Sequence, residues 1–230
     1  MKTDSVFWPV SRPLLILCGA LILLMLLGSA WVWSQLPDDA RIPVHWNIQG
    51  QPDRYSGKPE GLLLLPLITL AVTVLMLIIP RFEPRREHFR LSQKSYRIII
   101  GGIVVVMCGL HCGLLLAALG KPVDIGRFVP SAVGLLFIVI GNRMGKIRSN
   151  FFLGVRTPWT LSSELAWNKT HRFTGWLFVL LGIGLIISAT LFSGLATFIV
   201  LISGCVFIVG GSAVYSYLIW KKDPERSPKA

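Results

Sequence analysis

Charged residues are missing from long parts of this sequence. None of its 23 Lys and Arg and 11 Asp and Glu residues falls in six apolar blocks, which are Leu14–Trp33, Gly61–Pro80, Ile98–Leu119, Phe128–Gly141, Gly175–Phe192 and Leu195–Leu218. A membrane span needs roughly 20 apolar residues, because the hydrocarbon layer is about 30 Å thick and a helix rises about 1.5 Å per residue. Five blocks meet or approach that length, and Phe128–Gly141 does so only if Ile125 to Arg127 extend it. The pattern predicts an all-α polytopic membrane helical bundle of about six transmembrane helices.

Basic residues are unevenly shared among the segments between the blocks. Segments 1–13, 81–97, 142–174 and 219–230 hold 18 Lys and Arg, whereas 34–60 and 120–127 hold five. The side richer in Lys and Arg is the cytoplasmic side. We therefore expect both termini and loop 142–174 inside the cell, with loop 34–60 outside. The net charge of +12 follows mostly from this asymmetry, and without a basic soluble domain no direct nucleic-acid partner is expected.

The first block has two interpretations. Lys2 and Arg12 precede an apolar core, and Gly28-Ser29-Ala30 resembles a signal-peptidase site. The apolar run nevertheless continues through Trp33 and reaches spanning length. We favour a retained helix, and loop 34–60 lies outside in either case.

Cysteines are few, and none lies in an expected outer loop. All four, Cys18, Cys108, Cys112 and Cys205, fall in apolar blocks, so no disulfide framework is predicted. Cys108, His111 and Cys112 have the i, i+3, i+4 spacing of one helix face, which suits a soft metal. Helix packing is the favoured interpretation, because Gly109 and Gly113 occupy the same turns. We expect no metal and no cofactor.

The absence of charge from the blocks also limits the function. Coupled transporters usually keep Asp, Glu, Lys or Arg within the bilayer, whereas His111 is the only readily titratable side chain of these blocks. An enzyme would need a nucleophile–base pair or a metal triad, and the four histidines lie at different depths. We expect no enzyme, and a small-molecule or lipid transporter of the bacterial inner membrane remains the alternative function.

Loop 34–60 has the composition of a compact surface structure. Residues Ile42 to Ile48 suit a short strand, and tight turns are expected at Asn47, Gly50, Pro52-Asp53 and Ser56-Gly57. His45 with Asp38, Asp39 and Asp53 matches no standard metal-ligand set, and a turn role explains Asp53 more simply. The loop is either a recognition surface or a structural linker, and its sequence does not choose between them.

Loop 142–174 has more capping, aromatic and basic residues than a simple connector requires. Thr160 or Ser162 is expected to cap a short helix that ends near His171. Its apolar side, formed by Trp159, Leu161, Leu165 and Trp167, is expected to face the lipid headgroups. Arg156 offers a planar donor fork that Lys cannot reproduce, and Pro158 fixes the backbone direction. A docking patch for a cytoplasmic protein and a clamp between helices both fit.

The two loops resemble the SdpI family of bacterial membrane immunity proteins. The resemblance in the inner loop rests on Gly141-Asn142, Asn150, Gly154-x-Arg156-Thr157-Pro158-Trp159-Thr160, Trp167 and Thr170-His171. The outer loop resembles the small domain of unknown function often found before that family, through Pro43, His45, Asn47, Gly50 and Pro52-Asp53. One departure is Ser149, where the family pattern has Pro, and we expect it to cost rigidity before Asn150.

The resemblance implies a location, a role and partners. It implies a multi-pass protein of the bacterial cytoplasmic membrane that protects the cell against a secreted, membrane-active peptide toxin. In the best-known member, the protein also draws a cytoplasmic repressor to the membrane. The partners would then be membrane lipid, a peptide toxin on the outer face and a cytoplasmic repressor protein. We expect a two-helix region at 1–97 and a four-helix SdpI-like region at 98–230, with the quoted loop residues as the binding residues.

Overall fold

A computed structural model describes residues 11–192 and 194–225, so that Lys2, Arg226 and Lys229, which entered the charge comparison, lie outside the described residues. Six described helices are long and apolar enough to cross a membrane: α1 (Arg12–Gln35), α2 (Lys58–Ile78), α3 (Arg86–Ala118), α4 (Ile125–Met144), α6 (Glu164–Leu191) and α7 (Gly194–Lys221). The shorter elements are β1 (Ile42–Trp46), β2 (Pro52–Ser56), the 3-10 helix η1 (Ile79–Phe82) and α5 (Pro158–Leu161). The prediction of a polytopic helical membrane protein is confirmed.

The fourth span has the extension that its short apolar block required. Helix α4 begins at Ile125 because the Asp124 side chain accepts a hydrogen bond from the Arg127 N–H at 3.1 Å, which caps the helix. Residues 125–127 thus lengthen the span, as expected. The helix then continues three residues past Gly141, to Met144.

The expected loop 81–97 is mostly helical, so its boundary was wrong. Helix α3 starts at Arg86 rather than near Ile98. Its polar first turns are stable because they bury groups against other segments: the Ser92 hydroxyl accepts from the Arg148 N–H at 2.8 Å, and the Tyr96 hydroxyl donates to the Met76 carbonyl at 2.5 Å. Tertiary contacts, which hydropathy does not report, therefore extend this helix.

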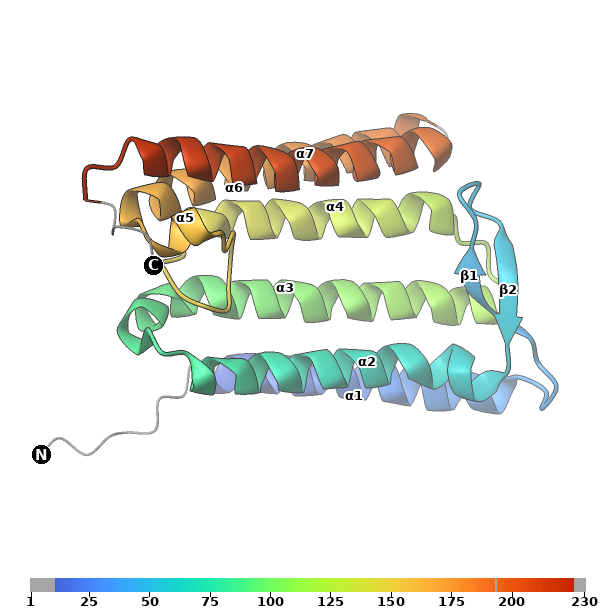
Figure 1. Cartoon of the computed structure of the whole chain (residues 1–230). Coiled ribbons are helices and arrows are strands. Elements are labelled where there is room, and N and C mark those ends of the chain that lie inside the picture. The colour runs from blue at the N-terminus through green and yellow to red at the C-terminus, as the bar shows by residue number, and fades with distance from the viewer. Residues whose placement is uncertain (1–10, 193, 226–230) are drawn as a thin grey trace, which may run out of the picture.

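The helices lie side by side along one bundle (Figure 1). Helices α1 and α2 pack on α3, α3 packs on α4, and α6 packs on both α4 and α7. The β1–β2 hairpin lies at one end of the bundle, the hairpin end. The connection from α4 to α6, residues 145–163, lies at the other end together with the first and last described residues; we refer to it as the signature loop and to this end as the loop end.

Helices α4 and α6 approach each other through two glycine pairs. A Cβ on Gly141 would lie 2.5 Å from the Gly175 carbonyl oxygen, and one on Gly134 would lie 2.6 Å from that of Gly182. Small residues at such crossings let membrane helices pack at short range. These contacts bring together the two helices that flank the signature loop.

A buried polar centre joins α1, α2 and α3. The Ser29 hydroxyl donates to the Leu62 carbonyl at 2.7 Å and lies 2.9 Å from Nε2 of His111, which also lies 3.2 Å from the Met25 carbonyl oxygen. Cys108 is buried one turn from His111, whereas Cys112 is exposed, and among the described residues the three side chains do not form a group that could hold a metal ion. This geometry favours the packing interpretation of the cysteine–histidine face.

Candidate functional sites

The expected outer loop is a two-stranded antiparallel hairpin. Strand β1 pairs with β2, with Pro43 opposite Tyr55. Ile42 anchors the hairpin, because it is buried against Val32 of α1 and Leu62 of α2. The first strand was predicted, but the second was missed: residues 52–56 form a strand rather than tight turns, and Asp53 is not a turn residue.

The turn between the strands rests on the start of α4. The Asn47 side-chain oxygen accepts hydrogen bonds from the backbone N–H groups of Gln49 and Gln51, each at 3.0 Å. Gly50 has φ 76°, and a Cβ there would lie 3.1 Å from the Cα of Gly126. Asn47 therefore shapes the turn, and Gly50 permits its close approach to α4.

His45 and Asp53 face each other across the strands. Nδ1 of His45 lies 2.6 Å from Oδ1 of Asp53, and both side chains are exposed. Asp38 instead pairs with Nζ of Lys58 at 3.1 Å. Among the described residues, no group of three His, Cys, Asp or Glu side chains converges as metal ligands would. The pair is a surface contact that fixes the position of the imidazole.

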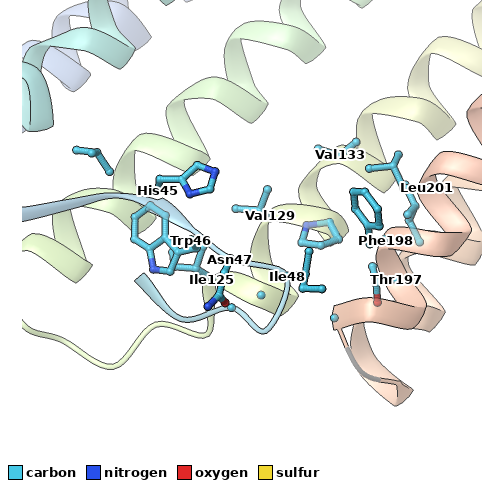
Figure 2. A pocket seen from close by; sticks show the side chains of 16 residues that line it. His45, Trp46, Asn47, Ile48, Ile125, Val129, Val133, Thr197, Phe198 and Leu201 are labelled. Carbon is cyan, nitrogen blue, oxygen red and sulfur yellow. The ribbon is translucent and has the colours of Figure 1, made fainter. Parts of the chain in front are cut away.

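A cavity of about 640 Å³ lies between the hairpin and helices α4, α6 and α7 (Figure 2). Its lining is mostly apolar and includes Trp46, Ile48, Val129, Val133, Phe198 and Leu201, with His45, Asn47 and Thr197 as polar neighbours. The Ile48 carbonyl oxygen would lie 1.7 Å from a Cβ on Gly194, so the hairpin touches the start of α7 directly. The cavity has the size and character of a site for an apolar ligand with a few polar groups.

The signature loop is held by the fully buried side chain of Asn150. Its oxygen accepts from the N–H groups of Phe152 and Leu153 at 2.9 and 2.7 Å, while its nitrogen donates to the carbonyls of Arg148 and Leu153 at 2.8 and 3.2 Å. One amide thus satisfies four backbone groups of a segment without regular structure. Asn150 shapes the loop and does not face solvent.

Gly154, Trp167 and His171 form one buried junction. Gly154 has φ 110° and lies so close that a Cβ would be 2.1 Å from Nε2 of His171. The His171 and Trp167 rings stack at 4.0 Å between centroids, and Trp167 Nε1 donates to the Ile147 carbonyl at 2.7 Å. Trp167 is fully buried, so the expectation that it faces the headgroups was wrong.

Thr157 and Thr160 form a capping box around α5, and the Thr157 hydroxyl also lies 3.0 Å from that of Ser216 on α7. Within α5, which begins at Pro158, Trp159 packs edge-on against Tyr217 at 5.2 Å between centroids. These contacts tie the loop to α7.

The helix expected to end near His171 is the start of a full span. Ser163, rather than Thr160 or Ser162, caps it by accepting from the Ala166 N–H at 2.9 Å. Ser163 also donates to a carboxylate oxygen of Asp223 beyond α7. The helix then continues to Leu191 without a break, because no proline interrupts it and its inward-facing polar residues, Thr170, His171, Thr174 and Ser188, are buried within the bundle.

The remaining expected site residues of the inner loop fall into an exposed group and a buried group. Asn142 on α4 and Arg156 in the signature loop are exposed, whereas Thr170 on α6 is fully buried. Nη1 of Arg156 donates to the Phe151 carbonyl at 2.5 Å, and the side chain otherwise faces outward. The structure thus separates buried loop-holding residues from a small exposed set.

The sequence analysis missed the link from the α2–α3 connection to the signature loop. The buried carboxylate of Glu83 accepts from the N–H groups of Arg85 and Phe151 at 2.9 and 3.0 Å. Arg85 donates to the Ser149 hydroxyl and to the Leu161 carbonyl, and lies over the Phe151 ring at 4.8 Å. Ser149 therefore supplies an acceptor that proline lacks. The only sequence signal was an acidic residue placed directly after a span.

Two family models match separate parts of this chain. Residues 146–216, which include most of the signature loop, α6 and most of α7, match the SdpI/YfhL protein family. The resemblance to the SdpI family is confirmed. Residues 20–70, which include the hairpin, match a domain of unknown function, DUF1648.

The SdpI resemblance extends along nearly the whole chain. The immunity protein SdpI of Bacillus subtilis (strain 168) is 26% identical over 204 residues, which cover 88% of this chain and 93% of that protein. No solved structure matches the chain. The chain is thus a multi-pass bacterial membrane protein similar to an immunity protein.

Proposed function

We propose that this chain protects a bacterial cell against a secreted, membrane-active peptide toxin. The hairpin end faces outward, and the loop end, with the first and last described residues, faces the cytoplasm, as the distribution of basic residues supports. The similarity to an immunity protein supports the role. The observation that carries a mechanism is the cavity of about 640 Å³ under the hairpin.

The cavity suits part of a peptide that has already entered the bilayer. Val129 and Val133 come from α4 and Phe198 from α7, so the walls are span residues near the hairpin end. An apolar side chain of the toxin would leave lipid for this cavity, while His45 and Asn47 offer polar contacts to its backbone. Such binding would hold the toxin before it disrupts the bilayer.

Signalling to a cytoplasmic repressor would use the opposite end. Helix α4 runs from the cavity to the signature loop, and α6 contributes Leu185 to the cavity and His171 to the loop junction. A ligand that favours one packing of α4 against α6 would shift the population of loop conformations. The exposed side chain of Arg156 then provides a docking contact for the repressor.

The function is tested by toxin survival. A deletion strain should be killed when peptide-toxin operons next to the gene are expressed, and the wild-type chain should restore growth. A variant with a disrupted hairpin core, Ile42→Asp, controls for expression load. Equal survival of the deletion and complemented strains across these toxins would contradict the proposal, and accumulation or efflux of a small solute in proteoliposomes would favour the transporter alternative.

A further inference from the structure

A second hollow, of about 440 Å³, lies at the loop end between α4 and α6. Gly141 and Gly175, which hold the two helices together, form its floor. Asn142 and Lys146 line one side, and Arg172 and Trp176 line the other. The proposed immunity mechanism leaves this groove and the Gly141-Asn142 motif unused.

The groove carries two cations without acidic partners. Lys146 and Arg172 are exposed, and among residues 11–192 and 194–225 neither side chain forms an ion pair or a hydrogen bond. The stem of Arg172 crosses Gly145 closely, since a Cβ there would lie 3.1 Å from the Arg172 Cγ. The glycine thus allows Arg172 to lie along the groove.

The groove is polar at its rim and apolar further toward the centre of the spans. Trp176 is 69% exposed although it lies within α6, as a tryptophan at the headgroup level of a membrane does. Val179, one helical turn further toward the centre of the span, adds an apolar wall below the basic rim. A ligand that fits has an anionic head and an apolar tail.

We propose that this groove binds the phosphate headgroup of an anionic phospholipid such as phosphatidylglycerol. Lys146 and Arg172 bind the phosphate, the Asn142 amide donates to a headgroup or phosphate oxygen, and an acyl chain lies along Val179. Basic pockets between helices at the membrane surface are suited to anionic headgroups. The bound lipid would bridge α4 and α6 next to the signature loop.

Native mass spectrometry of the full-length detergent-purified protein tests the proposal. Phosphatidylglycerol should be retained in preference to phosphatidylcholine, and Lys146→Gln and Arg172→Gln should each weaken that retention by about five-fold, as expected for one cation near an anionic surface. Arg86→Gln with Lys94→Gln is the matched control, because it removes two exposed cations of the loop end outside the groove. Its phosphatidylglycerol retention should equal that of wild type.

A second variant separates specific binding from loss of fold. Asn142→Asp keeps both cations but places a carboxylate beside the phosphate, so it should also reduce phosphatidylglycerol retention while phosphatidylcholine retention and the unfolding temperature stay unchanged. Equal retention of the two lipids by wild type, or an equal loss in the Arg86/Lys94 control, would overturn the proposal. Displacement of the lipid by equimolar glycerol phosphate would overturn it in favour of a soluble phosphate ligand.

Discussion

Nε2 of His171 accepts a hydrogen bond from the backbone N–H of Val155 at 3.1 Å, and Nδ1 of the same ring lies 2.8 Å from the carbonyl oxygen of Trp167. Nδ1 must then carry the proton, because a carbonyl only accepts. One neutral imidazole therefore connects the signature loop to the first turns of α6. The contact requires a residue without a side chain at position 154.

Gly154→Ala should destabilise the protein by more than backbone strain alone explains. Alanine at φ 110° is strained, and its Cβ would also overlap the His171 ring. Gly120→Ala is the matched control, because Gly120 has φ 68° with nothing within 4 Å of the added Cβ. Thermal unfolding in detergent should show Gly154→Ala losing about 1–3 kcal/mol beyond the control. Equal losses would mean that the loop moves freely away from His171.

Arg156→Lys should separate docking from structural support. The Arg156 side chain is exposed, and its one described hydrogen bond goes to the Phe151 carbonyl. The free energy of unfolding should therefore change by less than about 0.5 kcal/mol, and the amount of protein in the membrane should stay near that of wild type. Recruitment of the proposed cytoplasmic repressor in toxin-treated cells should fall, since Lys cannot reproduce the guanidinium fork. Arg86→Lys at the same end is the control.

A fall in stability with Arg156→Lys would instead assign Arg156 to the loop-holding residues. Wild-type behaviour in both assays would remove it from the candidate site.

Topology reporters should distinguish the two ends. Fusions at Gln51 and Lys121 should report the outside, and those at Glu87, Lys146 and Pro228 the cytoplasm, because the basic residues divide 18 to five between the two sides. Alkaline phosphatase and a fluorescent cytoplasmic reporter provide opposite readouts at each position. A cytoplasmic signal at Gln51 would reverse the assignment of both candidate sites.

The spans were predictable from the sequence because the lipid solvent imposes a simple rule. Long uncharged blocks must form helices that satisfy their own backbone groups, and even the extension of α4 to Ile125 followed from the required length. The start of α3 was not predictable, because Ser92 and Tyr96 stabilise it through hydrogen bonds to distant parts of the chain. Their partners, Arg148 and Met76, lie 56 and 20 residues away. Hydropathy contains no such information.

The sequence predicted which segments hold the candidate sites, but not the role of each residue in them. Composition and resemblance selected both loops, but the roles of single side chains depend on which of them are buried. Trp167 was expected at the membrane surface and lies in the core, whereas Asp53 was expected in a turn and lies on β2, where its carboxylate contacts the His45 ring. Glu83 was missed because one of its two hydrogen-bond donors, the Phe151 N–H, comes from a segment 68 residues further along the chain.

Filling the cavity under the hairpin tests the central claim most directly. Val129→Phe adds bulk to the lining of the cavity, while Val206→Phe makes the same change on α7 where the side chain is 67% exposed. In the deletion strain challenged with its peptide toxin, both variants should reach wild-type membrane levels by immunoblot. The account predicts that Val129→Phe loses protection and Val206→Phe retains it, and full survival with Val129→Phe would contradict it.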